Sequence, residues 1–347
     1  MGNPAFAASL IRTGLNGLAG SSASRLLESS TDAEAFADFE AWRVHAQTQL
    51  TELVAALEDE SPTVFAARAA WSRDAFAARG QSVALLSASL EALRSVLEDS
   101  LPAHAWAVIP PYFERAALEL SKPVTADACT LDPNDPAGRL ARDYIAALAN
   151  GDQRGAIELV LNAVTSGQLT PHLALGKVLI AAQREIGRLW HRGEWTIAEE
   201  HFASGVTRRL IERILAHAVT AEQTGKTVVV TSVSGDAHDL GVHVVSAFFE
   251  LAGWRSICLG ANTPVDDLVR IVTRFDVDLV ALGATLDTQR KTAQTMVAAL
   301  KNVRPHVRVI VGGSAFRDEP ATWQRIGADA FAASPQAAVD LANQLTS

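Results

Sequence analysis

From residue 226 onward, the chain alternates short apolar runs with longer helix-like stretches, and this alternation limits the fold more than any other feature. Runs this short and this apolar are typical of strands buried on both faces, and a helix after each strand makes neighbouring strands parallel. We therefore predict a doubly wound parallel sheet of five strands over residues 226–347. Such a sheet binds ligands at the carboxyl ends of its strands. The five runs are TVVVTSV, SICLG, DLVALGA, VRVIVGG and ADAFAA.

The N-terminal part of the chain has helical periodicity. Its apolar residues recur at helical spacing, so residues 1–122 are predicted to form an all-helical domain. Pro110 and Pro111 should break or kink the last helix, because proline lacks the backbone N–H that a helix interior needs. The clearest helically spaced set is Phe36, Phe39, Leu50, Leu53, Val54 and Leu57, and further helices are expected at about 62–79, 81–99 and 103–120.

A second helical block, residues 137–222, follows a linker rich in proline, aspartate and threonine. Short breaks separate its predicted helices, which is the pattern of an up-down four-helix bundle. Thr196 and Glu199 form a capping box, which should start the last helix. The four helices are expected at 139–149, 152–166, 170–190 and 197–218.

Charge and composition argue against several functions. The net charge is −9, and the nearest basic cluster, Arg208, Arg209 and Arg213, is typical of a solvated helix face, so direct binding of nucleic acid is not expected. Cys129 and Cys258 form no C-x-x-C pair, which fits a reducing cytoplasm. No apolar run approaches the roughly 20 residues of a membrane span, so we expect a cytoplasmic protein without membrane association.

A histidine lies in the turn expected after the first strand, within the stretch GDAHDLG. Asp236, His238 and Gly241 form the pattern D-x-H-x-x-G. A metal ligand oriented by a neighbouring acid would have this arrangement. A loop histidine that is merely hydrogen-bonded by that acid would have it as well, so the six residues alone leave both interpretations open.

Glycines mark the ends of two further strands. After Gly241 come 41 residues and then the triplet Gly283-Ala284-Thr285, and 26 further residues separate this triplet from Gly312-Gly313. A bulky ligand lying along these strand ends would need small residues, because glycine permits close approach of the backbone. A tight turn would explain Gly312-Gly313 alone. A nucleotide-binding fold would instead require G-x-G-x-x-G after the first strand, and that pattern is missing.

Taken together, these motifs resemble the cobalamin-binding domain of methionine synthase, corrinoid methyl carriers and mutases, whose pattern is D-x-H-x-x-G, S-x-L and G-G. The resemblance implies a flavodoxin-like fold with His238 as the lower axial ligand of cobalt and Asp236 bonded to its other ring nitrogen. The S-x-L serine is missing here, and Thr285 is the nearest hydroxyl. The lower-face residues implied to bind the cofactor are Asp236, His238, Asp239, Gly241, Gly283, Thr285, Gly312 and Gly313.

A second motif lies in the bundle, in the stretch LWHRGEWTIAEEHFASG. Trp190 is followed by nine residues and then by Glu200 and His201, and the turn HRGE would fold all three to one end of the bundle. A helical hairpin with a core tryptophan and a first-turn glutamate has the same pattern. Beside a cobalamin domain, however, W-x9-E-H resembles the motif of light-sensing cobalamin receptors of the CarH type, where it packs over the 5′-deoxyadenosyl group.

This second resemblance implies a photoreceptor that uses adenosylcobalamin and is not an enzyme. Trp190 would cover the adenosyl group, Glu200 would hydrogen-bond it, and His201 would help to hold the pocket. His191 matches a position that ligates cobalt after illumination in some such receptors, although a solvated turn histidine fits equally well. Photolysis would change the packing of the domains, so the resemblance implies a light-dependent homo-oligomer and an unidentified downstream partner.

The helical region 1–122 stands where those receptors carry a DNA-binding domain. This architecture resembles photocobilins, which imply biliverdin as a second chromophore. Core tryptophans and surface arginines would explain the same residues without any ligand. The residues that could line a bilin site are Trp42, Arg43, His45, Trp71, Arg73, His104, Trp106 and Tyr112, with Cys129 as a thioether anchor or an unmodified linker thiol.

The alternative function is a corrinoid methyl carrier of a methyltransferase system. The motif around His238 fits both functions. A methyl carrier must leave its small upper ligand reachable, so the set of Trp190, Glu200 and His201 favours the photoreceptor. A mutase fragment is not expected, because the chain has no (β/α)8 substrate barrel.

Overall fold

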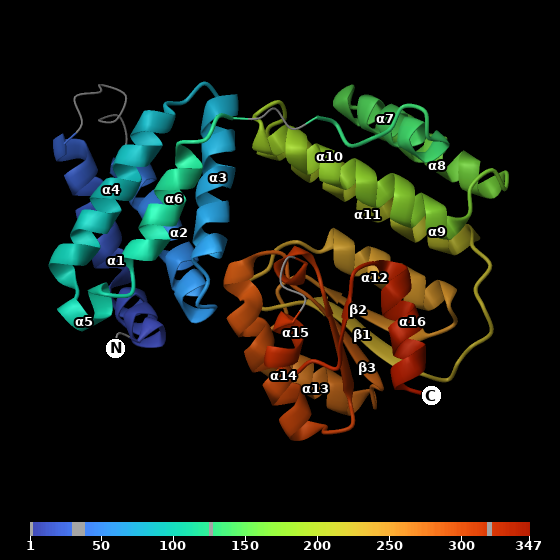
Figure 1. Ribbon diagram of the computed structural model, residues 1–347. Helices are drawn as coiled ribbons and strands as arrows, with labels where there is room; N and C mark the ends of the chain where they lie inside the picture. The colour runs from blue at the N-terminus through green and yellow to red at the C-terminus, as the bar shows by residue number, and fades with distance from the viewer. Residues whose placement is uncertain (1–2, 30–38, 125–127, 318–320) are drawn as a thin grey trace. The chain divides into compact units, whose positions relative to one another are not determined.

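The computed structural model describes residues 3–29, 39–124, 128–317 and 321–347, so Phe36 lies outside the described residues. The chain divides into two compact units, Met1–Asp127 and Ala128–Ser347. The first is entirely helical in its described part, and the second combines helices with a five-stranded sheet (Figure 1). The predicted fold class is therefore confirmed.

The N-terminal unit is built from helices that bury alanine, leucine and aromatic side chains. Leu50, Leu53 and Leu57 follow helical spacing and are buried, and Phe65 meets Phe113 with ring centroids 5.5 Å apart. Its described helices are α1 (Pro4–Ser29), α2 (Phe39–Glu58), α3 (Pro62–Ala78), α4 (Val83–Ser100), α5 (Ala103–Trp106) and α6 (Pro110–Leu120).

The proline pair interrupts the last predicted helix as expected. Helix α5 ends at Trp106, and Pro110 opens α6 in the first turn. Proline is tolerated there because the first backbone N–H groups of a helix have no intrahelical partner. None of the helices in the described ranges is long and apolar enough to cross a membrane.

The second unit begins with a helical bundle at the predicted positions. The capping box is formed, since Thr196 Oγ1 accepts from the Glu199 N–H and the Glu199 carboxylate accepts from the Thr196 N–H at 2.6 Å. One difference is a π-helical turn, Ala174–Leu179, inside the helix predicted at 170–190; such a turn adds a residue and shifts the register of the side chains that follow. The bundle comprises α7 (Pro136–Ala149), α8 (Gln153–Thr165), α9 (Pro171–Leu173), α10 (Ile180–His191) and α11 (Ile197–His217).

The sheet has the strand order β2-β1-β3-β4-β5, and all its described pairs are parallel. This is the flavodoxin-like order. The register places Gly283 directly beside Gly312 at the carboxyl ends of β3 and β4. The strands are β1 (Thr227–Ser232), β2 (Arg255–Gly260), β3 (Leu279–Gly283), β4 (Arg308–Gly312) and β5 (Ala330–Ala332).

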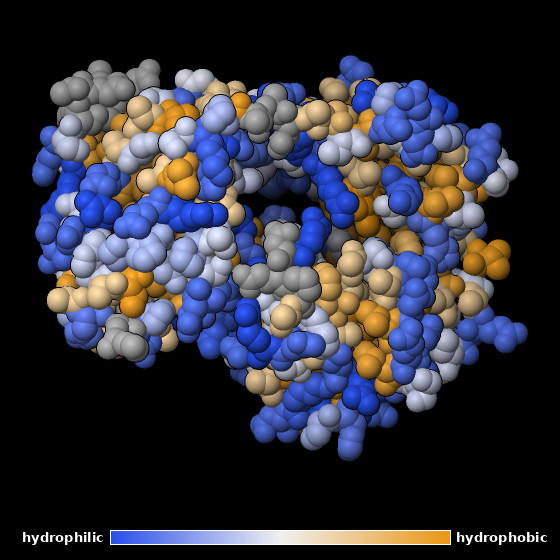
Figure 2. All heavy atoms as spheres, in the orientation of Figure 1, coloured by the Kyte–Doolittle hydropathy of each residue, from blue (hydrophilic) through white to orange (hydrophobic). Residues whose placement is uncertain are grey.

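Helices cover both faces of the sheet (Figure 1). One face packs with α12 and α16 into the same core as the bundle, and the other face packs with α13 and α14. Apolar residues are also visible at the surface between the bundle and the sheet (Figure 2). These helices are α12 (Leu240–Leu251), α13 (Val265–Arg274), α14 (Arg290–Val303), α15 (Thr322–Arg325) and α16 (Pro335–Leu345).

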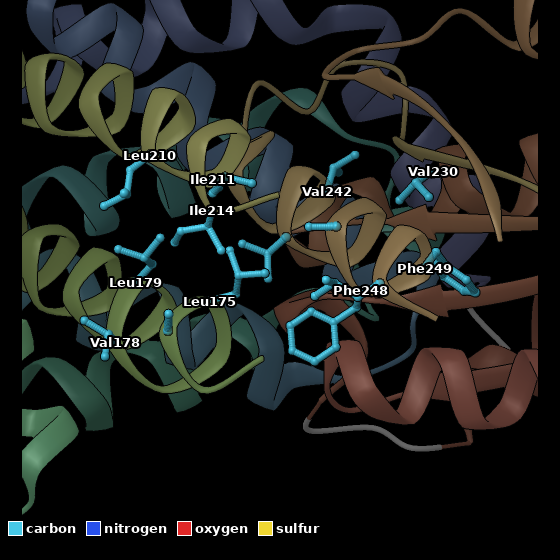
Figure 3. Close-up of a cluster of buried hydrophobic side chains, with 14 of the residues drawn as sticks. Leu175, Val178, Leu179, Leu210, Ile211, Ile214, Val230, Val242, Phe248 and Phe249 are labelled. Atoms are coloured by element: carbon cyan, nitrogen blue, oxygen red, sulfur yellow. The ribbon is translucent and has the colours of Figure 1, made fainter. Parts of the chain in front are cut away.

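A continuous apolar core joins the bundle to α12. Leu175, Leu179 and Ile214 point toward Val242 and Phe248 (Figure 3). Gly176 lies beside the same contact, where a Cβ would meet the Phe248 ring at an ordinary van der Waals distance of 3.5 Å. This packing fixes where the bundle helices stand relative to the strand ends, and hence which bundle residues face them.

The burial of His45 in α2 predicts that the stability of the N-terminal unit depends on pH. Burial lowers the pKa of His45 from 6.5 to about 4, and its ring packs against Trp42 and Phe76. Well above pH 6.5 the imidazole is neutral in both the folded and the unfolded chain. Between pH 6.5 and pH 4 the unfolded chain takes up a proton that the folded chain does not. We expect the free energy of unfolding to fall by about 2 kcal/mol between pH 7 and pH 5.

The His45→Leu variant should lose that part of the pH dependence, because leucine keeps the apolar contacts and cannot be protonated. Urea unfolding at several pH values measures it, with His306→Gln, at an exposed histidine, as the control. Equal pH dependence in wild type and His45→Leu would show that His45 is not the group responsible.

Candidate functional site: a cavity at the carboxyl edge of the sheet

A cavity of about 940 Å³ opens at the carboxyl ends of the strands in the Ala128–Ser347 unit. This is where a doubly wound sheet binds its ligands, and the volume lies at the upper end of the usual range for a ligand site. One wall comes from the sheet and the starts of α12 and α16, and the other comes from the bundle. Most of the lining is apolar, including Leu179, Val230, Val242, Ala281 and Ile310.

His238 lies in the turn between β1 and α12 and faces this cavity. Its Nδ1–H donates to Asp236 Oδ1 at 2.7 Å, and its backbone N–H donates to the same oxygen at 3.0 Å. The side chain of His238 is nevertheless 64% exposed. Because Nδ1 is engaged, the ring presents Nε2, and this is the arrangement of a histidine metal ligand held by a carboxylate.

Asp236 is held as firmly as His238. It is 1% exposed, and its Oδ2 accepts the backbone N–H of Thr285, at the end of β3, at 2.9 Å. Burial alone would raise the pKa of Asp236, but the hydrogen bonds from His238 and Thr285 outweigh burial and hold that pKa below its usual value. The pKa of His238 is raised, chiefly by the hydrogen bond to Asp236, against the opposing effect of burial.

The glycines at the strand ends divide into two kinds. A Cβ on Gly241 would meet no atom within 4 Å, so the protein's own packing does not require glycine there and the space is open to a ligand. Gly313 has a φ of 100°, and a Cβ would lie 2.1 Å from the Ala284 carbonyl oxygen, so the fold itself requires glycine. Gly283 and Gly312 also line the cavity.

The bundle wall is formed by residues that sequence analysis missed: Gln183 and Arg184 on α10 and Thr207 on α11. The Gln183 side chain is 2.6 Å from Thr207 Oγ1, which in turn lies 2.7 Å from the hydroxyl of buried Tyr144. Burial raises the pKa of Tyr144 to about 12, so this hydroxyl stays protonated. The sequence spacing could have indicated Thr207, because it lies two helical turns beyond Glu200 and therefore on the same face of α11.

The residues predicted for the upper face are not among those lining the cavity. Trp190 and His191 end α10, while Glu200 and His201 lie at the start of α11. Glu200 Oε2 is 2.7 Å from Nδ1 of His201, and Glu200 Oε1 accepts from Ser204 at 2.6 Å. Glu200 and His201, which are consecutive residues of α11, therefore bond to each other and not to a cavity-lining residue.

Asp239, the remaining predicted residue, has a structural partner instead. Arg208 on α11 donates to both carboxylate oxygens of Asp239, at 2.8 and 2.9 Å. Asp239 does not line the cavity. The ion pair ties the bundle to the loop that carries His238, which is a contact that sequence analysis did not anticipate.

Comparison with protein families identifies both halves of this cavity. Two models, each described as a B12 binding domain, match residues 226–342 and residues 140–215. The matched ranges contain His238 and the bundle wall, respectively. The cavity geometry suits such a cofactor, because it combines a free imidazole nitrogen with strand-end glycines and an open volume. The N-terminal unit lies outside both matches.

Curated relatives point in the same direction. The chain is 30% identical over 200 residues to dimethylamine corrinoid protein 3 of Methanosarcina acetivorans, which covers 54% of this chain and 90% of that protein. It is 26% identical to the trimethylamine corrinoid protein of Methanosarcina barkeri, covering 56% and 90%. The structure of the Methanosarcina barkeri monomethylamine corrinoid protein has a TM-score of 0.52 at 19% identity, covering 60% and 98%, and shows a shared fold.

These relatives correct several predictions. The light-sensing function, the resemblance to CarH-type receptors and photocobilins, biliverdin as a second chromophore and the light-dependent homo-oligomer are wrong, because the relatives are corrinoid proteins named for methylated amines. The physical reason for the error is that the motif around His238 is common to receptors and carriers. The W-x9-E-H spacing carried the distinction, and its residues are not among the described residues that line the cavity. The prediction that cobalamin binds is supported.

Replacing Asp236 with asparagine tests the role of the buried carboxylate. Asparagine can accept only through its single carbonyl oxygen, so it cannot receive the His238 and Thr285 N–H groups as the two oxygens of Asp236 do. We expect corrinoid affinity to fall about 10- to 100-fold. Equilibrium titration followed by visible absorption measures it, with Asp267→Asn, an exposed aspartate of α13, as the control. An unchanged dissociation constant for Asp236→Asn would contradict this role.

Proposed function

The chain belongs to the corrinoid protein family, and from this premise we propose that it carries a methyl group on the cobalt of a bound corrinoid within a methyltransferase system. The names of its relatives, which pair a corrinoid with methylated amines, support a methylated amine as the original methyl donor. The catalysts in this proposal are partner methyltransferases, and the chain itself is a carrier and not an enzyme.

The residues of the bundle wall are the observation that favours a small methyl group over an adenosyl group as the upper ligand. The cavity meets Leu179, Ile180, Gln183, Arg184 and Thr207 on that side, and no aromatic side chain of the bundle is among the described residues that line it. A site built to hold an adenosyl group would be expected to offer an aromatic surface and donors beside it. We therefore propose a methyl and not an adenosyl upper ligand.

In this proposal the roles divide between the two faces of the cavity. When bound, the corrinoid supplies the cobalt to which a methyl group is attached and from which it is transferred. His238 would hold the metal through Nε2, and Asp236 would keep the proton on Nδ1 and fix the ring's orientation. The Thr285 N–H holds Asp236 in turn, so the ligand is coupled to the end of β3.

The domains divide the work accordingly. Residues 226–347 would hold the corrinoid from below, with Gly241, Gly283 and Gly312 leaving room for it. Residues 137–222 would cover its upper face and restrict the access of water. The Arg208–Asp239 ion pair would hold the cover against the sheet domain until a partner needs the methyl group.

Labelled methyl loading tests the proposal. The chain is reconstituted with hydroxocobalamin, reduced, treated with radiolabelled methyl iodide in dim red light and passed through a desalting column. We expect wild type to retain a stoichiometric amount of label and His238→Gln to retain less than about a tenth of it, because the ligand that anchors the corrinoid is lost.

The variant His191→Gln, at the end of α10, is the matched control, because His191 is not among the described residues that line the cavity. It should retain label as wild type does. A wild-type chain that binds corrinoid but never acquires label would rule out the carrier function, and equal losses in His191→Gln and His238→Gln would rule out the assigned ligand.

A further inference from the structure

Polar side chains in the bundle are joined into one hydrogen-bonded row. The hydroxyl of Tyr144 lies 2.7 Å from Thr207 Oγ1, which accepts from Gln183 Nε2 at 2.6 Å. Ser204 Oγ lies 3.4 Å from Gln183 Oε1 and donates to Glu200 Oε1 at 2.6 Å. The row draws on α7, α10 and α11. Of its members, Gln183 and Thr207 line the cavity.

The row contains more polar hydrogens than it can bond internally. Tyr144, Thr207 and Ser204 each carry one hydroxyl hydrogen, and the Gln183 amide carries two hydrogens. Four contacts join these side chains to one another and to Glu200, and each contact holds at most one hydrogen. At least one hydrogen therefore has no acceptor among the described residues. Turning the Gln183 amide over does not change this result, because the number of contacts stays the same.

The hydrogen without an acceptor belongs to a residue of the cavity wall. Tyr144 is fully buried, and Thr207 is its one hydrogen-bond partner within the described parts of the chain. Its hydrogen therefore goes to Thr207, because a buried hydroxyl without an acceptor is unfavourable. The Ser204 hydrogen goes to the Glu200 carboxylate, because a charged acceptor forms the stronger bond. Thr207 or Gln183 therefore offers a hydrogen-bond donor to the cavity.

We propose that this donor discriminates between upper ligands of the corrinoid. It bonds an upper ligand that carries a lone pair on nitrogen or oxygen, and it finds no acceptor on a methyl group. A polar hydrogen that is shut off from water without an acceptor lowers stability. Methyl loading therefore weakens the hold of the bundle on the cavity, at the stage when a partner has to reach the methyl group. The inference rests on the corrinoid binding in the proposed function and does not depend on the methyl donor.

Cyanocobalamin and methylcobalamin test the donor, because cyanide offers a nitrogen lone pair and methyl offers none. Dissociation constants are measured in the dark for wild type, Tyr144→Phe and the triple variant Tyr144→Phe/Gln183→Leu/Thr207→Val. Tyr144→Phe is the matched background, because it keeps both candidate donors and removes the buried hydroxyl that the other substitutions would leave without a partner. Relative to it, the triple variant should lose about 5-fold in cyanocobalamin affinity and nothing in methylcobalamin affinity.

The infrared stretching band of the bound cyanide reports the hydrogen bond itself, and a merely structural role of these residues would not move it. Its frequency should differ between Tyr144→Phe and the triple variant. Thr165→Val, at an exposed threonine of α8, is the control and should match wild type in the band and in both dissociation constants. Circular dichroism confirms that the variants are folded.

Two acidic residues near the cavity in sequence require their own variant. Asp318 and Glu319 follow the lining residue Arg317 and lie outside the described residues. If either carboxylate accepted the hydrogen, the variant Asp318→Ala/Glu319→Ala would free the donor and raise the affinity for cyanocobalamin relative to methylcobalamin. We expect the ratio of the two dissociation constants to stay at the wild-type value, and a rise in that relative affinity would overturn the inference.

Equal losses of affinity for both corrinoids, no loss, or an unmoved cyanide band would also overturn the donor. A wild-type chain that binds neither corrinoid would contradict the corrinoid site of the proposed function, and the inference with it. A chain that shows the cyanide preference but never acquires the methyl label would contradict the carrier function alone.

Discussion

The hydrogen bond between Asp236 and His238 is the interaction on which the rest of the site depends. Burying a carboxylate is unfavourable, and Asp236 tolerates it because each of its oxygens accepts a backbone or ring N–H. The same bonds engage Nδ1 and leave Nε2 as the remaining ring nitrogen of a histidine that lines the cavity. The parallel sheet makes this possible, since it brings the loop after β1 beside the end of β3. The pairing of β1 with β3 therefore determines the hydrogen bonds that hold the candidate metal ligand.

The bundle completes the site through packing rather than through polar contacts. Its leucines and isoleucines share one core with α12, and this core sets which residues face the strand ends. Gln183, Arg184 and Thr207 reach the cavity for that reason. The Arg208–Asp239 pair is the polar exception, and it joins the bundle to the loop of the metal ligand. Partly exposed ion pairs contribute little free energy, so this link could open at small cost.

Much of the fold and half of the site could be predicted from sequence. Buried parallel strands are apolar on both faces, so the five strands could be recognised as short apolar runs. The Asp-x-His-x-x-Gly turn follows the first strand, at the sheet edge where such folds bind ligands. The upper wall could not be predicted in this way. Trp190 lies in the last turn of α10, and Glu200 and His201 lie in the first turns of α11. Helical spacing alone does not say which face of a helix turns toward the sheet. That orientation depends on the π-helical turn, which shifts the register of the side chains after it, and on the core that the bundle shares with α12. The function was wrongly predicted because the motif around His238 specifies the cofactor and does not specify what the cofactor is used for. The prediction therefore depended on the upper-face residues.

The coordinate bond from His238 to cobalt is the central claim, and electron paramagnetic resonance tests it most directly. The chain is produced with ¹⁵N-histidine, reconstituted with unlabelled cobalamin and reduced to the paramagnetic Co(II) state. Coordination by His238 predicts that the nitrogen splitting of the cobalt lines changes from the triplets of ¹⁴N to the doublets of ¹⁵N. Triplets that persist in the labelled protein would mean that the benzimidazole of the cofactor is still the lower ligand, and would contradict the claim.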